Sequence, residues 1–291
     1  MTAGLKEPSD MIIKAADGYE LAGTVYASDR PDATPMVIAG ATGVPRQFYR
    51  RFAEYAQARQ YHVLTFDYRG VGRSEGQSLK GSRINMLDWG RLDFSAALEA
   101  VASPSSPAVV VGHSFGGHAL GLVRRPELVS AACVFATGAG WHGHIPYPER
   151  LRVLALWNII LPPLIRWKGY APFKMLKMGE NLPLGVYQQW KRWCRYPHYF
   201  FDDPKMMPDI AAEFLRIRFP IMAVNALDDL WALPASRSAF MGGYKNATII
   251  PINLDPALFG GKVGHMGYFR PHVEPLWDDT LKWLGERLGS S

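Results

Sequence analysis

Cysteine is scarce in this chain, with only Cys133 and Cys194 among 291 residues. Two cysteines cannot build a disulfide framework, and alone they cannot supply the four ligands of a structural zinc site. Cys133 lies in the apolar run 131–136, where we expect a buried strand. A chain of this length buries enough surface to fold without cross-links. We therefore expect a reducing, cytoplasmic environment.

Long apolar runs are also missing. The most apolar stretch, residues 151–165, contains Arg152 and the pair Pro162-Pro163. It falls short of the ~20 apolar residues that a membrane-spanning helix needs. Residues 1–10 show no apolar core of a secretory signal. We expect neither a transmembrane helix nor a signal peptide, and the content of 48% hydrophobic and 20% charged residues is typical of a globular protein.

Acidic residues are few in one part of the chain. Between residues 141 and 200, nine Lys and Arg residues face only two Glu, whereas the net charge of the whole chain is +6. The basic surplus therefore belongs to one segment and does not coat the protein. Such a distribution gives no reason to expect nucleic-acid binding.

Apolar runs with the look of buried strands alternate with stretches of helical spacing. Two β-rich runs at 11–15 and 20–26, separated by Asp17-Gly18, predict a hairpin. Further strands are predicted at 35–39, 62–66, 108–111, 131–136, 220–224 and 247–252, and helices at 46–59, 87–101, 115–125 and 275–288. Strands that are apolar throughout and alternate with helices indicate an α/β fold with a mostly parallel sheet, covered by helices on both faces.

Residues 141–208 interrupt this alternation. They show no strand pattern, contain many prolines and hold five of the nine tryptophans. We interpret them as a helical lid inserted into a core formed by residues 1–140 and 209–291. The aromatic side chains of the lid either pack on the core or line a pocket for an acyl or aromatic group. Its basic surplus also fits weak contact with an anionic lipid surface.

The segment Gly112-His113-Ser114-Phe115-Gly116 has the pattern Gly-x-Ser-x-Gly. A serine hydroxyl is a weak nucleophile until a base takes its proton. Small residues around the serine allow a sharp strand-to-helix turn that exposes its Oγ. Here an apolar strand precedes the motif and a helix-competent stretch follows it, which favours Ser114 as a nucleophile. The alternative is a glycine-rich turn with an incidental serine.

A base and an acid follow in the expected order. Of the eight histidines, His265 lies after the last predicted strand and before the terminal helix. Asp228 and Asp229 follow the strand at 220–224, and one of them would orient the imidazole. The register of the strand end favours Asp229 and leaves Asp228 as the alternative acid. The order Ser114, Asp, His265 is typical of strand–turn–helix serine hydrolases.

The oxyanion donors are expected on two backbone segments. One donor is the N–H of Phe115, at the start of the helix after the serine. The second should come from the glycine-rich loop 40–43, with Ala41 as first choice and Thr42 as second. A plain turn remains the alternative for this loop. The candidate pocket residues are Thr42, Trp141, Trp231 and Met266.

These motifs resemble the α/β-hydrolase superfamily, and within it the lid-bearing, serine aminopeptidase-type bacterial hydrolases. The resemblance spans residues 10–288 and is carried by Ala41-Thr42-Gly43-Val44-Pro45, residues 66–74, the elbow 112–117, Asp228-Asp229 and residues 264–269. It implies the α/β-hydrolase fold and supports Ser114, His265 and an aspartate at 228 or 229. One departure concerns the oxyanion loop, where many relatives have His-Gly and this chain has Ala39-Gly40.

We therefore expect a serine hydrolase that cleaves carboxylic esters of small or acyl-chain substrates through an acyl-enzyme. No cofactor or metal is expected, because no histidine or carboxylate cluster accompanies Asp228-Asp229. The same triad would serve a thioesterase, an acyltransferase or an amidase. The basic lid disfavours an aminopeptidase, whose substrate amine calls for carboxylates. A lipid- or ligand-binding protein with a vestigial triad is the non-enzymatic alternative, and the intact triad weighs against it.

Overall fold

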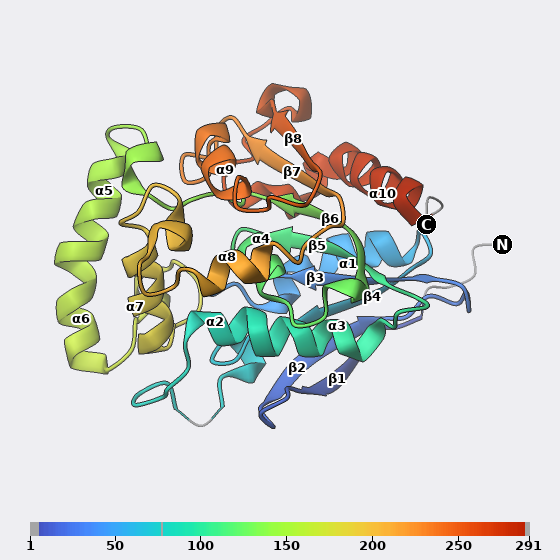
Figure 1. Cartoon of the computed structure of the whole chain (residues 1–291), viewed down its shortest axis with the longest axis horizontal. Coiled ribbons are helices and arrows are strands. Elements are labelled where there is room, and N and C mark those ends of the chain that lie inside the picture. Colours follow the sequence, from blue (N-terminus) through green and yellow to red (C-terminus); the bar gives the residue numbers. More distant parts are fainter. Residues whose placement is uncertain (1–5, 77, 289–291) are drawn as a thin grey trace.

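The computed structural model describes residues 6–76 and 78–288. Eight strands form one sheet in the order β1-β2-β4-β3-β5-β6-β7-β8 (Figure 1). The strands are β1 Ser9–Lys14, β2 Glu20–Tyr26, β3 Thr34–Ala39, β4 Tyr61–Phe66, β5 Ala108–His113, β6 Val129–Phe135, β7 Ile221–Ala226 and β8 Ile249–Leu254. The pairs β1–β2 and β2–β4 are antiparallel and the others are parallel, which confirms the predicted hairpin and the mostly parallel sheet.

The central strands are apolar throughout because both of their faces are covered. On one face, Ile38, Val111 and Cys133 pack with helices α1 Arg50–Gln57 and α10 Glu274–Leu288. On the other face, Val37 and Val110 pack with the helical stretch that ends in α3. Apolar residues at alternate positions of a strand point to opposite faces, so each strand contributes to both cores.

Two helical stretches flank the second core. The first runs without a break through α2 Met86–Asp88, a π-helical segment Trp89–Phe94 and α3 Ser95–Val101. The second, α4 Phe115–Ala119 followed by a 3₁₀ turn Leu120–Leu122, is shorter than the predicted helix at 115–125. The Arg124 N–H donates to Ser95 Oγ at 2.9 Å, not to a helical carbonyl. Pro126 also disfavours a helical conformation at the residue before it.

Residues 141–208 lie between β6 and β7 and are largely helical. The helices of this region are α5 Glu149–Ala155, a π-helical turn Leu156–Ile160, α6 Leu161–Lys168 and α7 Leu184–Trp193. After the region, α8 Asp209–Phe214 precedes β7 and α9 Pro234–Met241 follows it. Figure 1 shows α5 and α6 at the outer edge, with α7 between them and the rest of the chain. Val153, Trp157 and Leu161 are buried at a spacing of four, as expected for the inner face of a helix.

Contacts with α2 fix the position of α7. The Gln189 side-chain oxygen accepts the Met86 N–H at 2.6 Å and the Leu87 N–H at 3.2 Å. These two amides belong to the first turn of α2, where no intrahelical acceptor exists. Residues 141–208 are therefore joined to the rest of the chain by a polar contact as well as by apolar packing.

The loop after β4, noted in the sequence as residues 66–74, is held by buried ion pairs. Asp67 pairs with Arg46 at 2.6 Å, and Arg69 pairs with Asp93 at 2.7 Å. All four side chains are almost fully buried. Removing one partner of such a pair leaves an uncompensated charge, so these contacts fix the loop in one conformation. Within residues 6–76 and 78–288, no helix has the length and apolar character needed to cross a membrane.

Candidate active site

A strained turn joins β5 to α4 at Ser114. Its backbone has φ 51° and ψ −106°, a region that non-glycine residues adopt only when the surroundings enforce it. Gly116 makes the close approach of α4 to β3 feasible, because a Cβ there would lie 2.1 Å from the Ala39 carbonyl oxygen. The turn directs the serine toward the carboxyl ends of the parallel strands, where loops from several strands meet.

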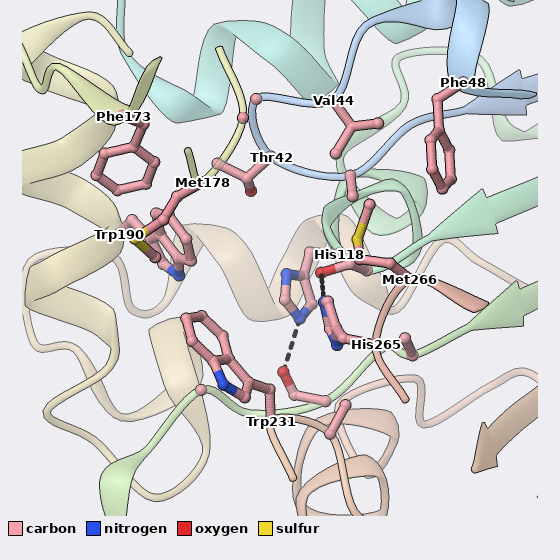
Figure 2. A pocket seen from close by; sticks show the side chains of 18 of the residues that line it. Thr42, Val44, Phe48, His118, Phe173, Met178, Trp190, Trp231, His265 and Met266 are labelled. Atoms are coloured by element: carbon pink, nitrogen blue, oxygen red, sulfur yellow. Dashed lines mark hydrogen bonds between the residues drawn. The ribbon is translucent and has the colours of Figure 1, made fainter. Parts of the chain in front are cut away.

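Ser114 lies within hydrogen-bonding distance of His265, and His265 of Asp229. His265 Nε2 is 3.0 Å from Ser114 Oγ, and His265 Nδ1 is 2.9 Å from Asp229 Oδ2 (Figure 2 shows the His265–Ser114 contact). Because the carboxylate only accepts, Nδ1 carries the proton and the Nε2 lone pair faces the hydroxyl. Asp229 is fully buried and also accepts the backbone N–H of Trp231 at 3.0 Å, which fixes its orientation.

Asp228 does not contact the imidazole. Its two oxygens accept the backbone N–H groups of Val263 at 3.0 Å and Gly264 at 2.9 Å. These residues precede His265 in the loop after β8, so the Asp228 carboxylate anchors the loop that carries His265. The alternative assignment of Asp228 as the triad acid is therefore wrong in this structure, because its two oxygens accept the backbone N–H groups of Val263 and Gly264 and not the His265 ring.

The expectation that Ala41 supplies an oxyanion donor is also wrong. The Ala41 N–H donates to Tyr49 Oη at 2.8 Å in a buried contact, so it is not available to a substrate. Thr42, the second choice, lies in the wall of the cavity beside Ser114, and no described residue accepts its N–H. Phe115 is the first residue of α4, where a backbone N–H has no intrahelical acceptor. The remaining candidate donors are therefore Thr42 and Phe115.

His113 and His118 flank Ser114 in sequence and are both buried and neutral. His113 Nε2 contacts the His265 carbonyl oxygen at 2.8 Å, and its Nδ1 lies 3.0 Å from Tyr49 Oη. Burial lowers the pKa of His113 to about 3 and the pKa of His118 to about 4. Both rings bind backbone carbonyl oxygens through Nε2, and the imidazole in contact with Ser114 Oγ is that of His265.

A cavity of about 490 Å³ opens above Ser114. Of the predicted pocket residues, Thr42, Trp231 and Met266 lie in its wall (Figure 2). Trp141 does not line it, because its ring packs against His142 and His144 with centroids 5.6 and 5.1 Å apart. The insertion contributes a further wall: Phe173, Lys177, Met178, Gly179, Trp190 and Tyr199.

The sequence did not indicate that His118 reaches this cavity. It lies four residues after Ser114, which is about one helical turn, and this spacing could have indicated that both side chains lie on the same side of the helix. Its Nε2 contacts the Gly138 carbonyl oxygen at 2.9 Å. No carboxylate stands among the described residues that line the cavity, and Lys177 is their only permanent charge. The site is therefore suited to an apolar group beside the serine. Over the described ranges, no three His, Cys, Asp or Glu residues are grouped so as to hold a metal ion.

Comparison with known proteins places the chain in a family. The model of the "Alpha/beta hydrolase family" matches residues 36–274. The chain is 33% identical over 123 residues to the quorum-quenching protein AidA of Acinetobacter baumannii (strain MDR-ZJ06). The matched region makes up 39% of this chain and 40% of AidA. The chain therefore spans only 38% and 40% of the lengths of the two curated relatives that it matches.

Solved structures agree in fold. The alpha/beta hydrolase GrgF from Penicillium sp. sh18 superposes with a TM-score of 0.66 at 16% identity, covering 98% of this chain and 100% of GrgF. The enol-lactonase from Burkholderia xenovorans LB400 superposes with a TM-score of 0.59 at 17% identity, covering 96% and 100%. At such identities the likeness concerns the fold alone.

Proposed function

Because this chain belongs to the alpha/beta hydrolase family, we propose that it is a serine hydrolase that cleaves carboxylic esters. The observation that carries the proposal is the contact chain Ser114–His265–Asp229 at the floor of an apolar cavity. Within the family, its motifs resemble those of the lid-bearing, serine aminopeptidase-type hydrolases. The substrate is a small molecule with an ester or acyl group.

The reaction begins when His265 Nε2 takes the proton from Ser114 Oγ as the oxygen attacks the acyl carbon. Asp229 holds the imidazole in the tautomer that makes this transfer feasible and stabilises the imidazolium. The backbone N–H groups of Phe115 and Thr42 stabilise the negative oxygen of the tetrahedral intermediate. His265 then gives the proton to the leaving alkoxide, and the acyl-enzyme forms.

Deacylation repeats these steps with water. His265 takes a proton from the water molecule, hydroxide attacks the acyl carbon, and the proton returns to Ser114 Oγ as the acid leaves. No cofactor takes part. With a thiolate as the leaving group, the same steps hydrolyse a thioester. With a second alcohol in place of water, they transfer the acyl group to that alcohol. Both reactions pass through the same kind of tetrahedral intermediate.

The cavity favours an ester over a peptide with a free amino terminus. An ammonium group is best recognised by a carboxylate, and none stands among the described residues that line the cavity. The largely apolar wall instead suits an acyl chain or a ring. Lactones, which are cyclic esters, belong in the tests because one similar structure is an enol-lactonase.

A series of p-nitrophenyl esters from acetate to decanoate, together with a lactone, tests the proposal. We expect turnover by the wild type and a fall of more than about 10³-fold in Ser114→Ala. Ser238→Ala is the matched control, because its hydroxyl bonds only the exposed carbonyl of Pro234 within α9. Turnover that persists in Ser114→Ala would remove the basis of the proposal.

We also propose that residues 141–208 form a lid over the cavity and make weak contact with anionic lipid. The support for a lid is that six residues of this segment line the cavity. The support for lipid contact is its basic surplus together with exposed apolar side chains, as at Ile159 and Trp167. A cytoplasmic location is proposed because Cys133 and Cys194 are both free thiols.

A further inference from the structure

A second cavity of about 280 Å³ lies within the insertion, beside the one above Ser114. Gly140 lines both cavities. The other described lining residues come from the loop after β6, from α5 and its π-helical turn, and from α7 and the residues after it: His142, Val153, Leu154, Trp157, Asn158, Lys191, Cys194 and Arg195. This cavity plays no part in the reaction derived above.

The second cavity carries positive charge without a matching acid. Lys191 and Arg195 are four residues apart, and no carboxylate stands among the described residues that line the cavity. Lys191 Nζ donates to the Trp157 carbonyl oxygen at 2.6 Å, which neutralises no charge. Burial and the nearby Arg195 charge both lower the pKa of Lys191. Lys191 is half-buried and Arg195 is exposed, and an anion bound between them would offset the repulsion between their charges.

The acidic residues of this region are already paired elsewhere. Asp203 forms a charged pair with Arg192, and Glu149 accepts from Trp231 Nε1 and contacts Arg152. The His142 ring adds a polar edge to the cavity, since its Nδ1 is buried and none of the described residues bonds it. The cavity thus presents two cations and an imidazole, and its own surroundings do not neutralise them.

Gly140 lies at the boundary of the two cavities, because it lines both of them. A Cβ there would lie 2.8 Å from Cys194 Sγ, so the glycine lets the Cys194 side chain pack against this boundary. A substrate whose apolar part fills the first cavity would reach the second cavity beside Gly140. The geometry therefore links an apolar subsite at the serine with a basic subsite beyond it.

We propose that the cavity lined by Lys191 and Arg195 binds an anionic group, a carboxylate or a phosphate, carried by the substrate that is cleaved at Ser114. The source of the anion rests on the proposed hydrolase function, whereas anion binding itself does not. The same chemistry would be supplied by a free small anion, so the test has one arm for each source.

The first arm measures binding without catalysis. Inorganic phosphate is titrated into Ser114→Ala protein and followed by calorimetry and by tryptophan fluorescence, because Trp157 lines the cavity. We expect saturable binding that weakens roughly tenfold or more in Lys191→Met and in Arg195→Met. The control is Lys205→Met, which removes one exposed positive charge of the same region outside the cavity. Absence of saturable binding, or equal binding in all variants, contradicts the anion site.

The second arm identifies the source of the anion. The kcat/KM values for 4-nitrophenyl octanoate and for mono-4-nitrophenyl suberate, an acid-terminated ester of the same chain length, are compared. We expect the wild type to prefer the acid-terminated ester and Arg195→Met to lose roughly tenfold in kcat/KM for it alone. Phosphate binding without this preference would show that the cavity binds a free anion and not an acid group of the substrate.

Two further results separate the inference from the proposed function. Loss of ester turnover in all proteins, with phosphate binding intact, would contradict the hydrolase function and leave the anion site standing. Equal turnover of both esters, together with no phosphate binding, would contradict the anion site and leave the hydrolase function standing.

Cations near the end of α7 also interact with the helix dipole. That structural role predicts altered thermal stability in Lys191→Met but no change in ester preference.

Discussion

His113 Nε2 donates a hydrogen bond to the backbone carbonyl of His265, 2.8 Å away. The residue before Ser114 thus holds the loop that carries His265. On the other side of the ring, Tyr49 O–H donates to His113 Nδ1, and Tyr49 Oη in turn accepts the Ala41 N–H. This buried chain joins the loop after β3, the elbow and the loop after β8, so all three are fixed relative to one another.

The Tyr49 hydroxyl is the centre of that chain, and its removal should affect both stability and catalysis. Tyr49→Phe leaves the Ala41 N–H and His113 Nδ1 without partners, which should cost about 1–3 kcal/mol of unfolding free energy. We expect kcat for p-nitrophenyl esters to fall severalfold because His265 loses its support. Urea unfolding and steady-state kinetics measure both effects. Wild-type values for both would show that the chain does not position the base.

The two adjacent aspartates should differ sharply in their effect on rate. Asp229→Asn removes the carboxylate that orients His265, and comparable changes in other serine triads lower kcat by about 10⁴. Asp228→Asn keeps an oxygen that can accept one loop amide, so we expect a loss below about tenfold and a lower melting temperature. Equal losses in both variants would contradict the assignment of Asp229 as the acid.

Acid should destabilise the fold through its buried histidines. The folded-state pKa values of about 3 for His113 and about 4 for His118 lie below the usual value of 6.5. The unfolded chain therefore binds protons that the folded chain excludes, and stability present above pH ~6.5 is lost as the pH falls. Each histidine contributes a slope of about 1.4 kcal/mol per pH unit below pH ~6.

Urea unfolding at pH 8.5, 7.5, 6 and 5 checks this expectation. His118→Gln should show a shallower loss of stability toward low pH, by about one proton, and no change in slope above pH 7.5. Identical slopes in the variant and the wild type would mean that the His118 ring is accessible to protons in the folded state.

The outer face of the insertion should bind anionic membranes weakly. Ile159 and Trp167 are 69% and 67% exposed along the continuous helical stretch 149–168, next to the exposed side chains of Arg152 and Arg166. Apolar and basic side chains on one exposed helix face are typical of interfacial segments. We expect co-sedimentation with phosphatidylglycerol vesicles at low salt and not with phosphatidylcholine vesicles.

The double variant Ile159→Ser, Trp167→Ser should lose this binding. The control is Leu258→Ser, since Leu258 is 77% exposed but lies after β8, outside the insertion. Raising the salt concentration should weaken binding of the wild type, because charge attraction to the surface is screened. Equal sedimentation of both variants would contradict a docking role for the helix face.

Much of the fold was predictable because its signals are local. Each parallel strand is a short run that is apolar on both faces, and the elbow combines such a run with two small residues in fixed positions. The hairpin β1–β2 followed from Asp17-Gly18 between two β-rich runs. These features depend on the period of the side chains and on steric limits within a few residues, which the sequence states directly.

The errors concern side-chain contacts that no periodic pattern in the sequence fixes. Ala41 was a reasonable donor until the Tyr49 hydroxyl, eight residues further along, took its N–H. Trp141 belongs to the aromatic insertion, but its ring turns onto His142 and His144, and no pattern in the sequence fixes that rotamer. The helix after Ser114 ends early, with the 3₁₀ turn Leu120–Leu122, and the Arg124 amide binds Ser95 of another helix. Such competition for a backbone group appears only once the chain is folded.

Covalent labelling shows whether Ser114 is the nucleophile. The wild-type protein is treated with a fluorophosphonate, digested, and the adduct located by mass spectrometry. We predict one adduct per chain on the Ser114 Oγ, strongly slowed in His265→Ala and absent in Ser114→Ala. No adduct on the wild type, or an adduct on another residue with Ser114 unmodified, would contradict the account.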